Sequence, residues 1–112
     1  MITSELQRNK ALKNIKLIVT DIDGTLLNDN GEVGSESKKL VKELMKLNVM
    51  VSFATGRLHS AVTEIAKELS LNGYIISLDG ALIKNYISDK TIYESYLSTN
   101  QVKKAIELSE KT

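Results

Sequence analysis

The sequence predicts an α/β fold in which a parallel sheet carries helices on both faces. Three short apolar runs alternate with two segments in which apolar residues recur at helical spacing. Near-continuous apolar strands are typical of parallel sheets, which are buried on both sides. Polar turn residues follow each apolar run, as expected where a strand gives way to a right-handed crossover.

Composition narrows the functional classes. The chain has 112 residues, of which 42% are hydrophobic and 26% are charged, so it can bury the core of one small domain. A net charge of +1, one Phe and no Trp provide neither the basic face nor the stacking surface of a nucleic-acid-binding protein. The absence of Cys excludes disulfides and thiolate catalysis. No apolar run reaches the roughly 20 residues of a membrane span, and the polar N-terminus is unlike a secretory signal. We therefore expect a cytoplasmic protein that binds neither nucleic acid nor a membrane.

The first half of the chain should contain one strand and one helix. A polar lead-in is expected over residues 1–14, and the partly β-branched run 15–20 predicts the first strand. The segment 28–31 contains Asn-Gly, which favours a tight turn. A helix should then begin near residue 34 or 35, where Gly and Ser are acceptable caps. Asn48 can take the left-handed conformation that ends this helix.

The second half repeats this order and adds a hairpin. The buried run 49–54 predicts the second strand, and the helix after it is expected to stop at Asn72-Gly73. The run 74–78 predicts the third strand. The remaining expected elements are a hairpin of 82–86 and 91–97 and a last helix capped by Ser98 or Thr99.

Polar residues follow all three predicted parallel strands. Asp21-Ile22-Asp23 follows the first, Thr55-Gly56-Arg57 the second and Asp79-Gly80 the third. Each motif alone has a plain structural explanation: a solvated turn for the two acids, a helix cap for Thr-Gly and a turn for Asp-Gly. Ligands of open parallel sheets bind beyond the carboxyl ends of the strands. The joint pattern therefore predicts one functional site.

Two carboxylates at one strand end suit phosphoryl transfer. Asp21 could attack phosphorus and form an acyl-phosphate, and the Asp23 side chain could serve as general acid and base. Repulsion between the attacking anion and the phosphate calls for a hard cation such as Mg²⁺, with the Asp21 carboxylate and the main-chain carbonyl of Asp23 as ligands. Gly24 would let the backbone turn sharply. The Thr55 hydroxyl and the Gly56 amide could hold the phosphate at a helix N-terminus.

At these positions the sequence resembles the haloacid dehalogenase (HAD) superfamily, and within it the Cof-type sugar-phosphate phosphatases. The resemblance rests on KLIVTDIDGTLLN, VMVSFATGR and YIISLDGALI, and it covers nearly all of residues 15–97. It implies a Rossmann-like (HAD-like) fold. It also implies Mg²⁺-dependent hydrolysis of a small phosphorylated metabolite, a sugar phosphate, through an aspartyl-phosphate.

The resemblance also assigns roles residue by residue. Asp21 would be the nucleophile and Asp23 the acid/base, and both would belong to the Mg²⁺ site. The residues assigned to phosphate or substrate are Gly24, Thr25, Thr55, Gly56, Arg57, Asp79 and Gly80. Asp79-Gly80-Ala81 stands where the branch often has Asn-Gly-Ala, and a carboxylate cannot donate a hydrogen bond as an amide does.

Two features of the family are missing from this sequence. The family has a downstream Lys and an acidic pair that complete the site, beyond an inserted cap domain, and neither is found here. We therefore expect the N-terminal part of a longer phosphatase, with a HAD-like core over 15–97 and a truncated start of the cap over 98–112. An incomplete sheet would leave an edge open to a second copy or a partner chain. The alternative is a catalytically silent fragment that serves as an interaction or regulatory module, or that needs a partner chain.

Overall fold

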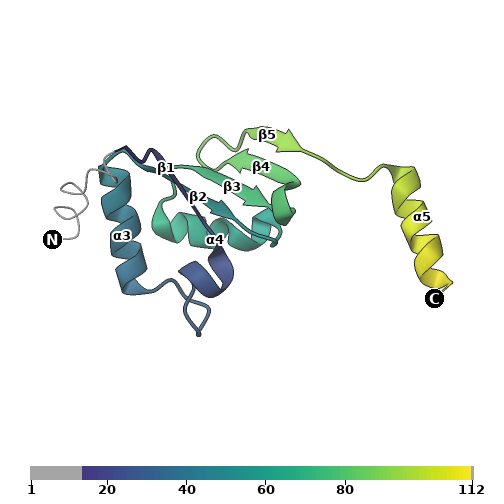
Figure 1. Ribbon diagram of the computed structural model, residues 1–112, viewed down its shortest axis with the longest axis horizontal. Helices are drawn as coiled ribbons and strands as arrows, with labels where there is room; N and C mark the ends of the chain where they lie inside the picture. Colours follow the sequence, from purple (N-terminus) through teal and green to yellow (C-terminus); the bar gives the residue numbers. More distant parts are fainter. Residues whose placement is uncertain (1–13, 112) are drawn as a thin grey trace.

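The computed structural model describes residues 14–111, in which two helices pack on a five-stranded sheet and a third helix stands apart (Figure 1). The predicted lead-in over 1–14, except for its last residue, lies outside the described residues. The strands follow one another across the sheet in chain order. They are β1 (Leu17–Thr20), β2 (Met50–Ala54), β3 (Tyr74–Ser77), β4 (Leu82–Asn85) and β5 (Thr91–Glu94).

The first three strands are parallel, so their carboxyl ends meet at one edge of the sheet. Leu17 of β1 lies opposite Met50 of β2, and Phe53 of β2 lies opposite Ile75 of β3. β4 and β5 are antiparallel additions that begin with Leu82 opposite β3. The predicted parallel sheet and the hairpin that follows it are therefore confirmed.

The two crossover helices lie on the same face of the sheet. α3 (Ser35–Lys46) joins β1 to β2, α4 (His59–Leu69) joins β2 to β3, and Figure 1 shows both below the sheet. The predicted fold class is confirmed, but within residues 14–111 its helices cover one face rather than two. The strand order advances in one direction from β1 to β3, so two right-handed crossovers must fall on one side.

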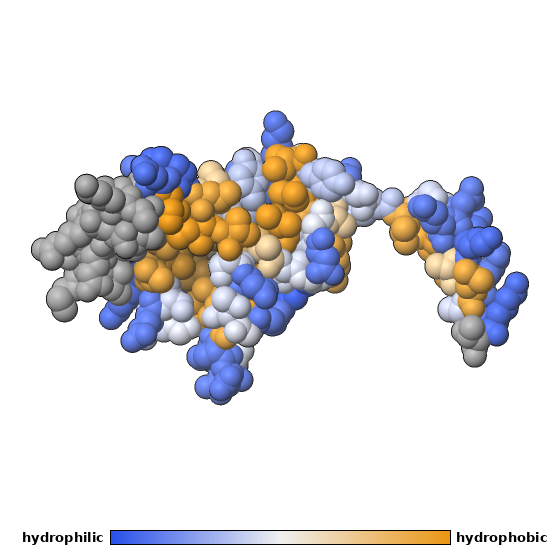
Figure 2. All heavy atoms as spheres, viewed as in Figure 1, coloured by the Kyte–Doolittle hydropathy of each residue, from blue (hydrophilic) through white to orange (hydrophobic). Residues whose placement is uncertain are grey.

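The core lies between the sheet and these helices. Phe53 of β2, Ile75 of β3 and Val62 of α4 are fully buried members of one apolar cluster. Alternation along β1 places Leu17 and Val19 on the other face, where they are 51% and 46% exposed. Figure 2 shows apolar residues gathered around this end of the sheet. Burial is therefore deepest between α4 and the strands β2 and β3, and it is incomplete around β1.

The sequence predicted the end of α3 correctly but not the end of α4. Asn48 follows α3 with a φ of 61°, which is the left-handed conformation expected there. α4 ends at Leu69, because Ser70 takes the left-handed conformation with a φ of 53°. The predicted stop at Asn72-Gly73 is therefore late by two residues, because Ser70 already ends the helix. Asn72 and Gly73 instead contact the segment that contains β2.

The last helix, α5 (Thr99–Glu110), stands apart from the sheet (Figure 1), and all of its residues are exposed. The Ser98 Oγ accepts a hydrogen bond from the Gln101 N–H at 3.1 Å, and the Gln101 Oε1 accepts one from the Ser98 N–H at 2.8 Å. This reciprocal pair confirms Ser98 as the cap. Across residues 14–111, the structure contains no helix with the length and apolar character needed to cross a membrane.

Candidate active site

The segment after β1 forms a tight loop that presents two carboxylates. Asp21 follows the strand, and its Oδ1 accepts a hydrogen bond from the Ile22 N–H at 2.7 Å. The loop, η1 (Ile22–Leu26), turns at Gly24 with a φ of 74°, as predicted from the sequence. Ile22 and Leu26 are buried and fix the loop to the core, while Asp21 and Asp23 stay exposed. The fold therefore delivers both carboxylates to the edge where ligands of such sheets bind.

The segment after β2 brings a buried hydroxyl and an arginine to the same edge. The Thr55 N–H donates to the Ile76 carbonyl at 2.8 Å, and the Thr55 Oγ1 accepts from the Arg57 N–H at 3.0 Å. Thr55 is buried, and its hydroxyl hydrogen is still available to a ligand. α4 begins only at His59, so Gly56 does not lie in its first turn, as the sequence had suggested. Any anion here would meet a strand-to-helix loop rather than the end of α4.

The segment after β3 is strained and is tied to the segment after β2. Leu78 and Asp79 both have left-handed backbones, with φ of 51° and 54°. The Leu78 N–H donates to the Arg57 carbonyl at 3.0 Å, and the Asp79 N–H donates to the Thr55 carbonyl at 3.2 Å. The Asp79 Oδ1 lies 3.0 Å from the point where a Cβ on Gly56 would stand, so Gly56 leaves room for this carboxylate. Strain of this kind is held in place by surrounding structure and clusters at functional sites.

An ion pair between Asp23 and Arg57 joins the first two segments. The Arg57 Nε donates to the Asp23 Oδ2 at 2.8 Å, and the Arg57 Nη2 donates to the Asp23 Oδ1 at 2.5 Å. The hydrogen bond from Arg57 lowers the pKa of Asp23 most strongly, burial opposes this effect, and the positive charge of Arg57 lowers the pKa further. Asp23 is therefore held as a carboxylate. The sequence identified both residues but gave no sign that they pair.

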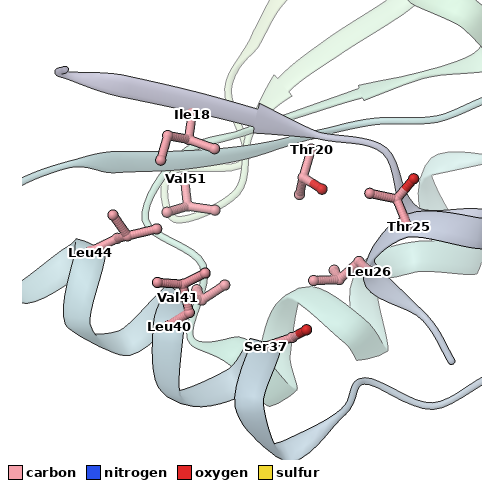
Figure 3. A pocket seen from close by; sticks show the side chains of 9 residues that line it. All are labelled: Ile18, Thr20, Thr25, Leu26, Ser37, Leu40, Val41, Leu44 and Val51. Atoms are coloured by element: carbon pink, nitrogen blue, oxygen red, sulfur yellow. The ribbon is translucent and has the colours of Figure 1, made fainter. Parts of the chain in front are cut away.

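Thr25 and Gly80 are less closely tied to this edge. Thr25 instead lies on an apolar groove of about 200 Å³ between β1 and α3 (Figure 3). No hydrogen bond within residues 14–111 links the Thr25 side chain to the other candidate residues. Gly80 continues the left-handed run after β3 with a φ of 99°. The groove and the polar edge are therefore distinct features of the surface.

The oxygen donors at this edge are of the kind that Mg²⁺ binds. Asp21 is exposed and uses one carboxylate oxygen for the Ile22 N–H, and its other oxygen makes no hydrogen bond within residues 14–111. No group of three or more His, Cys, Asp or Glu side chains that could hold a metal is found in the part of the chain that the structure describes. Mg²⁺ is often bound through one or two carboxylates together with water and substrate oxygens. The donor set therefore fits Mg²⁺ in kind, with few protein ligands.

Comparison with known proteins points to one group. Residues 18–112 match a family model described as haloacid dehalogenase-like hydrolase. The chain is 39% identical over 70 residues to the 5-amino-6-(5-phospho-D-ribitylamino)uracil phosphatase YcsE of Bacillus subtilis, a match that covers 62% of this chain and 28% of that protein. It is 37% identical over 68 residues to the HMP-PP phosphatase of Serratia proteamaculans, which covers 61% of this chain and 25% of that protein. The matched length is thus about a quarter of each relative.

Solved structures share the fold. A haloacid dehalogenase-like hydrolase from Bacteroides thetaiotaomicron matches with a TM-score of 0.80 at 30% identity, over 88% of this chain and 38% of that one. A haloacid dehalogenase-like hydrolase from B. subtilis matches with a TM-score of 0.76 at 27% identity, over 87% of this chain and 34% of that one. Both similarities extend over most of this chain, so the arrangement of strands and helices is that of these hydrolases.

Proposed function

This chain belongs to the haloacid dehalogenase-like hydrolase family, and we propose that it carries the nucleophile-bearing part of a Mg²⁺-dependent phosphate-monoester hydrolase. One observation supports this most strongly. Three parallel strands end at one edge, where Asp21, the Asp23–Arg57 ion pair, Thr55 and Asp79 meet. Two carboxylates beside a guanidinium and a hydroxyl suit attack on phosphorus with the phosphate oxygens bound.

In the proposed reaction, Asp21 is the nucleophile. The hydrogen bond from the Ile22 N–H orients its carboxylate and leaves the second oxygen open. That oxygen forms a bond to phosphorus while the bond from phosphorus to the leaving oxygen breaks. Asp23, which is a carboxylate while Arg57 holds it, takes up a proton from solvent once the substrate is bound, gives it to the leaving oxygen and later takes one from the attacking water. The water oxygen then bonds to phosphorus, the aspartyl-phosphate bond breaks, and Asp21 returns to a carboxylate as phosphate leaves.

The proposed Mg²⁺ would be held by the Asp21 carboxylate and the main-chain carbonyl of Asp23. When bound, it would offset the repulsion between two anions. The Thr55 hydroxyl can donate to a phosphate oxygen, because its lone pair already accepts from the Arg57 N–H. Thr55, Gly56 and Arg57 would therefore position the phosphate from the side of β2.

The proposed substrate is a small phosphorylated metabolite, with a sugar phosphate as the first choice. The named relatives support this class, because one is a phosphatase of a phosphoribityl compound and another of HMP-PP. In the proposed organisation, residues 15–97 belong to the catalytic core, and 98–112 begin a cap that selects the substrate. The separation of α5 from the sheet is consistent with that division.

Turnover of p-nitrophenyl phosphate tests the proposal. With Mg²⁺ present, Asp21→Asn should lower turnover by at least about a thousand-fold, because removal of a nucleophile abolishes the covalent step. Asp29→Asn, in the exposed turn after η1, is the matched control and should leave turnover unchanged. Equal turnover by the Asp21→Asn variant and the unsubstituted chain would reject the assignment of Asp21.

A catalytically silent interaction or regulatory module is the second candidate. It is favoured by apolar residues that the described chain leaves uncovered, namely Leu17 and Val19 on β1 and Val102, Ile106 and Leu108 on α5. Such surfaces invite association with a second copy or a partner chain. A folded chain that binds Mg²⁺ but shows no Asp21-dependent turnover would favour this second candidate.

A further inference from the structure

We propose that Arg57 is an exchangeable clamp, which holds Asp23 in the free protein and transfers to the phosphate of an incoming ligand. Arrival of the anion would thereby release the Asp23 carboxylate. This inference rests on the proposed function, since it concerns how that site passes from its free state to its bound state. It makes Arg57 a positioning residue for Asp23 as well as a ligand for the anion.

The geometry of the pair supports exchange. Arg57 offers two parallel N–H donors, Nε at 2.8 Å and Nη2 at 2.5 Å from the two Asp23 oxygens. A phosphate presents two oxygens in nearly the same arrangement, so it can take the place of the carboxylate on the same fork. Asp23 and a phosphate cannot occupy both donors at once. The anion must therefore displace Asp23 to gain the full contact.

Hydrogen bonds hold the backbone of Arg57 in place, so the exchange involves side chains and not the main chain. Its N–H is bound to the Thr55 Oγ1, and its carbonyl accepts from the Leu78 N–H. On the other side, Asp23 lies between the fully buried Ile22 and the left-handed Gly24. The Arg57 backbone is thus tied to both neighbouring segments, and the exchange needs only the two side chains to change partners.

The exposure of the pair argues against a purely structural role. The side chains of Arg57 and Asp23 are 39% and 57% exposed. Exposed ion pairs contribute little net stability, because water already solvates both charges well. A pair that is geometrically good but energetically weak is easily broken by a competing anion, which is what a clamp of this kind requires.

The test measures binding of inorganic phosphate to the full 112-residue chain in EDTA, by NMR of backbone amides and of the Arg57 Nε–Hε group. In the unsubstituted chain, added phosphate should shift the Arg57 Nε–Hε signal together with the amides of Asp23 and Gly24. This readout needs no variant and no catalysis. A purely structural ion pair would leave all three signals in place.

Two substitutions with the same charge change sharpen the test. Asp23→Asn removes the competitor for Arg57 and should tighten phosphate binding roughly three-fold to five-fold, as expected for loss of an exposed ion pair. Asp79→Asn removes a carboxylate at the same edge that makes no hydrogen bond to Arg57, and it should tighten binding less than about two-fold. Equal effects of the two substitutions would reduce the result to net charge and overturn the clamp, as would an unmoved Arg57 signal. Neither outcome depends on turnover, so failure here is distinct from failure of the proposed hydrolysis.

Discussion

The polar groups at the amino end of the β2–β3 pair are hydrogen-bonded within the protein, whereas several polar groups at its carboxyl end are exposed to solvent. At the amino end, the Asn72 side chain accepts from the Val51 N–H at 2.8 Å and donates to the Val49 carbonyl at 3.2 Å. The Ser52 Oγ accepts from the Tyr74 N–H at 2.8 Å. We call this region, made by Val49, Val51, Ser52, Asn72, Gly73 and Tyr74, the seam. The Asn72 and Ser52 side chains thus supply hydrogen bonds between the two segments at the point where β3 starts.

The carboxyl end leaves its polar groups open. Asp21 and Asp79 are exposed carboxylates, and Asp23 is held only by an ion pair that solvent reaches. Leu78 and Asp79 also have strained backbones. We therefore expect the stability of the fold to depend more on the seam, where these polar groups bond within the chain, than on the opposite end, where exposed carboxylates and strained backbones lie. Breaking the seam should therefore cost much more than changes at the carboxyl end.

The largest effect is expected for Gly73→Ala. A Cβ on Gly73 would lie far inside van der Waals contact of the Val51 carbonyl oxygen and the Ser52 Oγ, and 2.8 Å from the Val51 carbonyl carbon. The Val51 carbonyl belongs to the backbone of β2 and cannot move away without separating two strands. We expect the free energy of unfolding to fall by at least about 3 kcal/mol, as for severe overpacking. Urea denaturation followed by circular dichroism measures this change.

Gly34→Ala is the matched control for Gly73→Ala. Gly34 precedes α3 with a φ of −64°, and a Cβ there would meet no atom within 4 Å. The same substitution at this position should change the free energy of unfolding by less than about 1 kcal/mol. A similar decrease in the free energy of unfolding for both variants would show that the seam tolerates an added methyl group as well as an open position does.

A smaller loss is expected for Asn72→Ala. This change leaves the N–H of Val51 and the carbonyl of Val49 without partners in a buried region, which costs about 2 kcal/mol. The amide of Val51 should also exchange with deuterium faster than its neighbours in β2. Asn100→Ala, on the exposed first turn of α5, should leave the free energy of unfolding within about 0.5 kcal/mol. An unchanged Val51 amide would contradict the bridging role of Asn72.

Local signals in the sequence predicted the strands, the start of α3, the Ser98 cap and the left-handed positions at Gly24 and Asn48. The strands followed from apolar runs, the Ser98 cap from its side-chain oxygen and the two left-handed positions from the backbone preferences of Gly and Asn, all of which act locally. The predicted end of α4 was wrong because Asn72-Gly73 looks like a helix stop. In the structure the Asn72 side chain bonds to the backbone near β2, and Gly73 has no side chain because the Val51 carbonyl lies too close. The distinction between the two uses depends on contacts with β2, which local preferences do not contain.

The contacts within the candidate site were the least predictable part. The sequence placed polar groups at three strand ends, and the fold brings those ends together. The Asp23–Arg57 pair joins residues 34 positions apart, and it depends on how two loops direct their side chains. Leu78 gave no signal at all, because a large apolar residue rarely adopts a positive φ. Residue identity thus revealed which groups reach the edge, but their partners followed only from the structure.

The smallest predicted effect concerns His59, which is the first residue of α4 and lies on the side of the carboxyl ends of β2 and β3. Its Nδ1 is buried without a hydrogen-bond partner, in contrast to the Asn72 and Ser52 side chains of the seam, which bond to the backbone. Burial lowers the pKa of His59 below its ordinary value of 6.5, the charge of Lys84 adds to this, and Asp89 opposes it. The unfolded chain therefore binds more protons near this pH than the folded chain. The stability that neutral His59 contributes is complete above pH 6.5 and is lost as the pH falls through the lowered pKa.

The chain contains a single His, so this pH range isolates its side chain from the carboxylates, which titrate lower. The free energy of unfolding should decline from pH 7 to pH 5 by urea denaturation, and His59→Gln should remove most of that slope. Asp89→Asn should steepen it, because Asp89 is paired with Lys84 at 2.7 Å and its loss leaves that positive charge unbalanced beside His59. An identical slope in the His59→Gln variant would mean that the unpaired nitrogen at the carboxyl end costs the folded state nothing on protonation. The contrast between the two ends of the β2–β3 pair would then rest on Asp21, Asp23 and Asp79 alone.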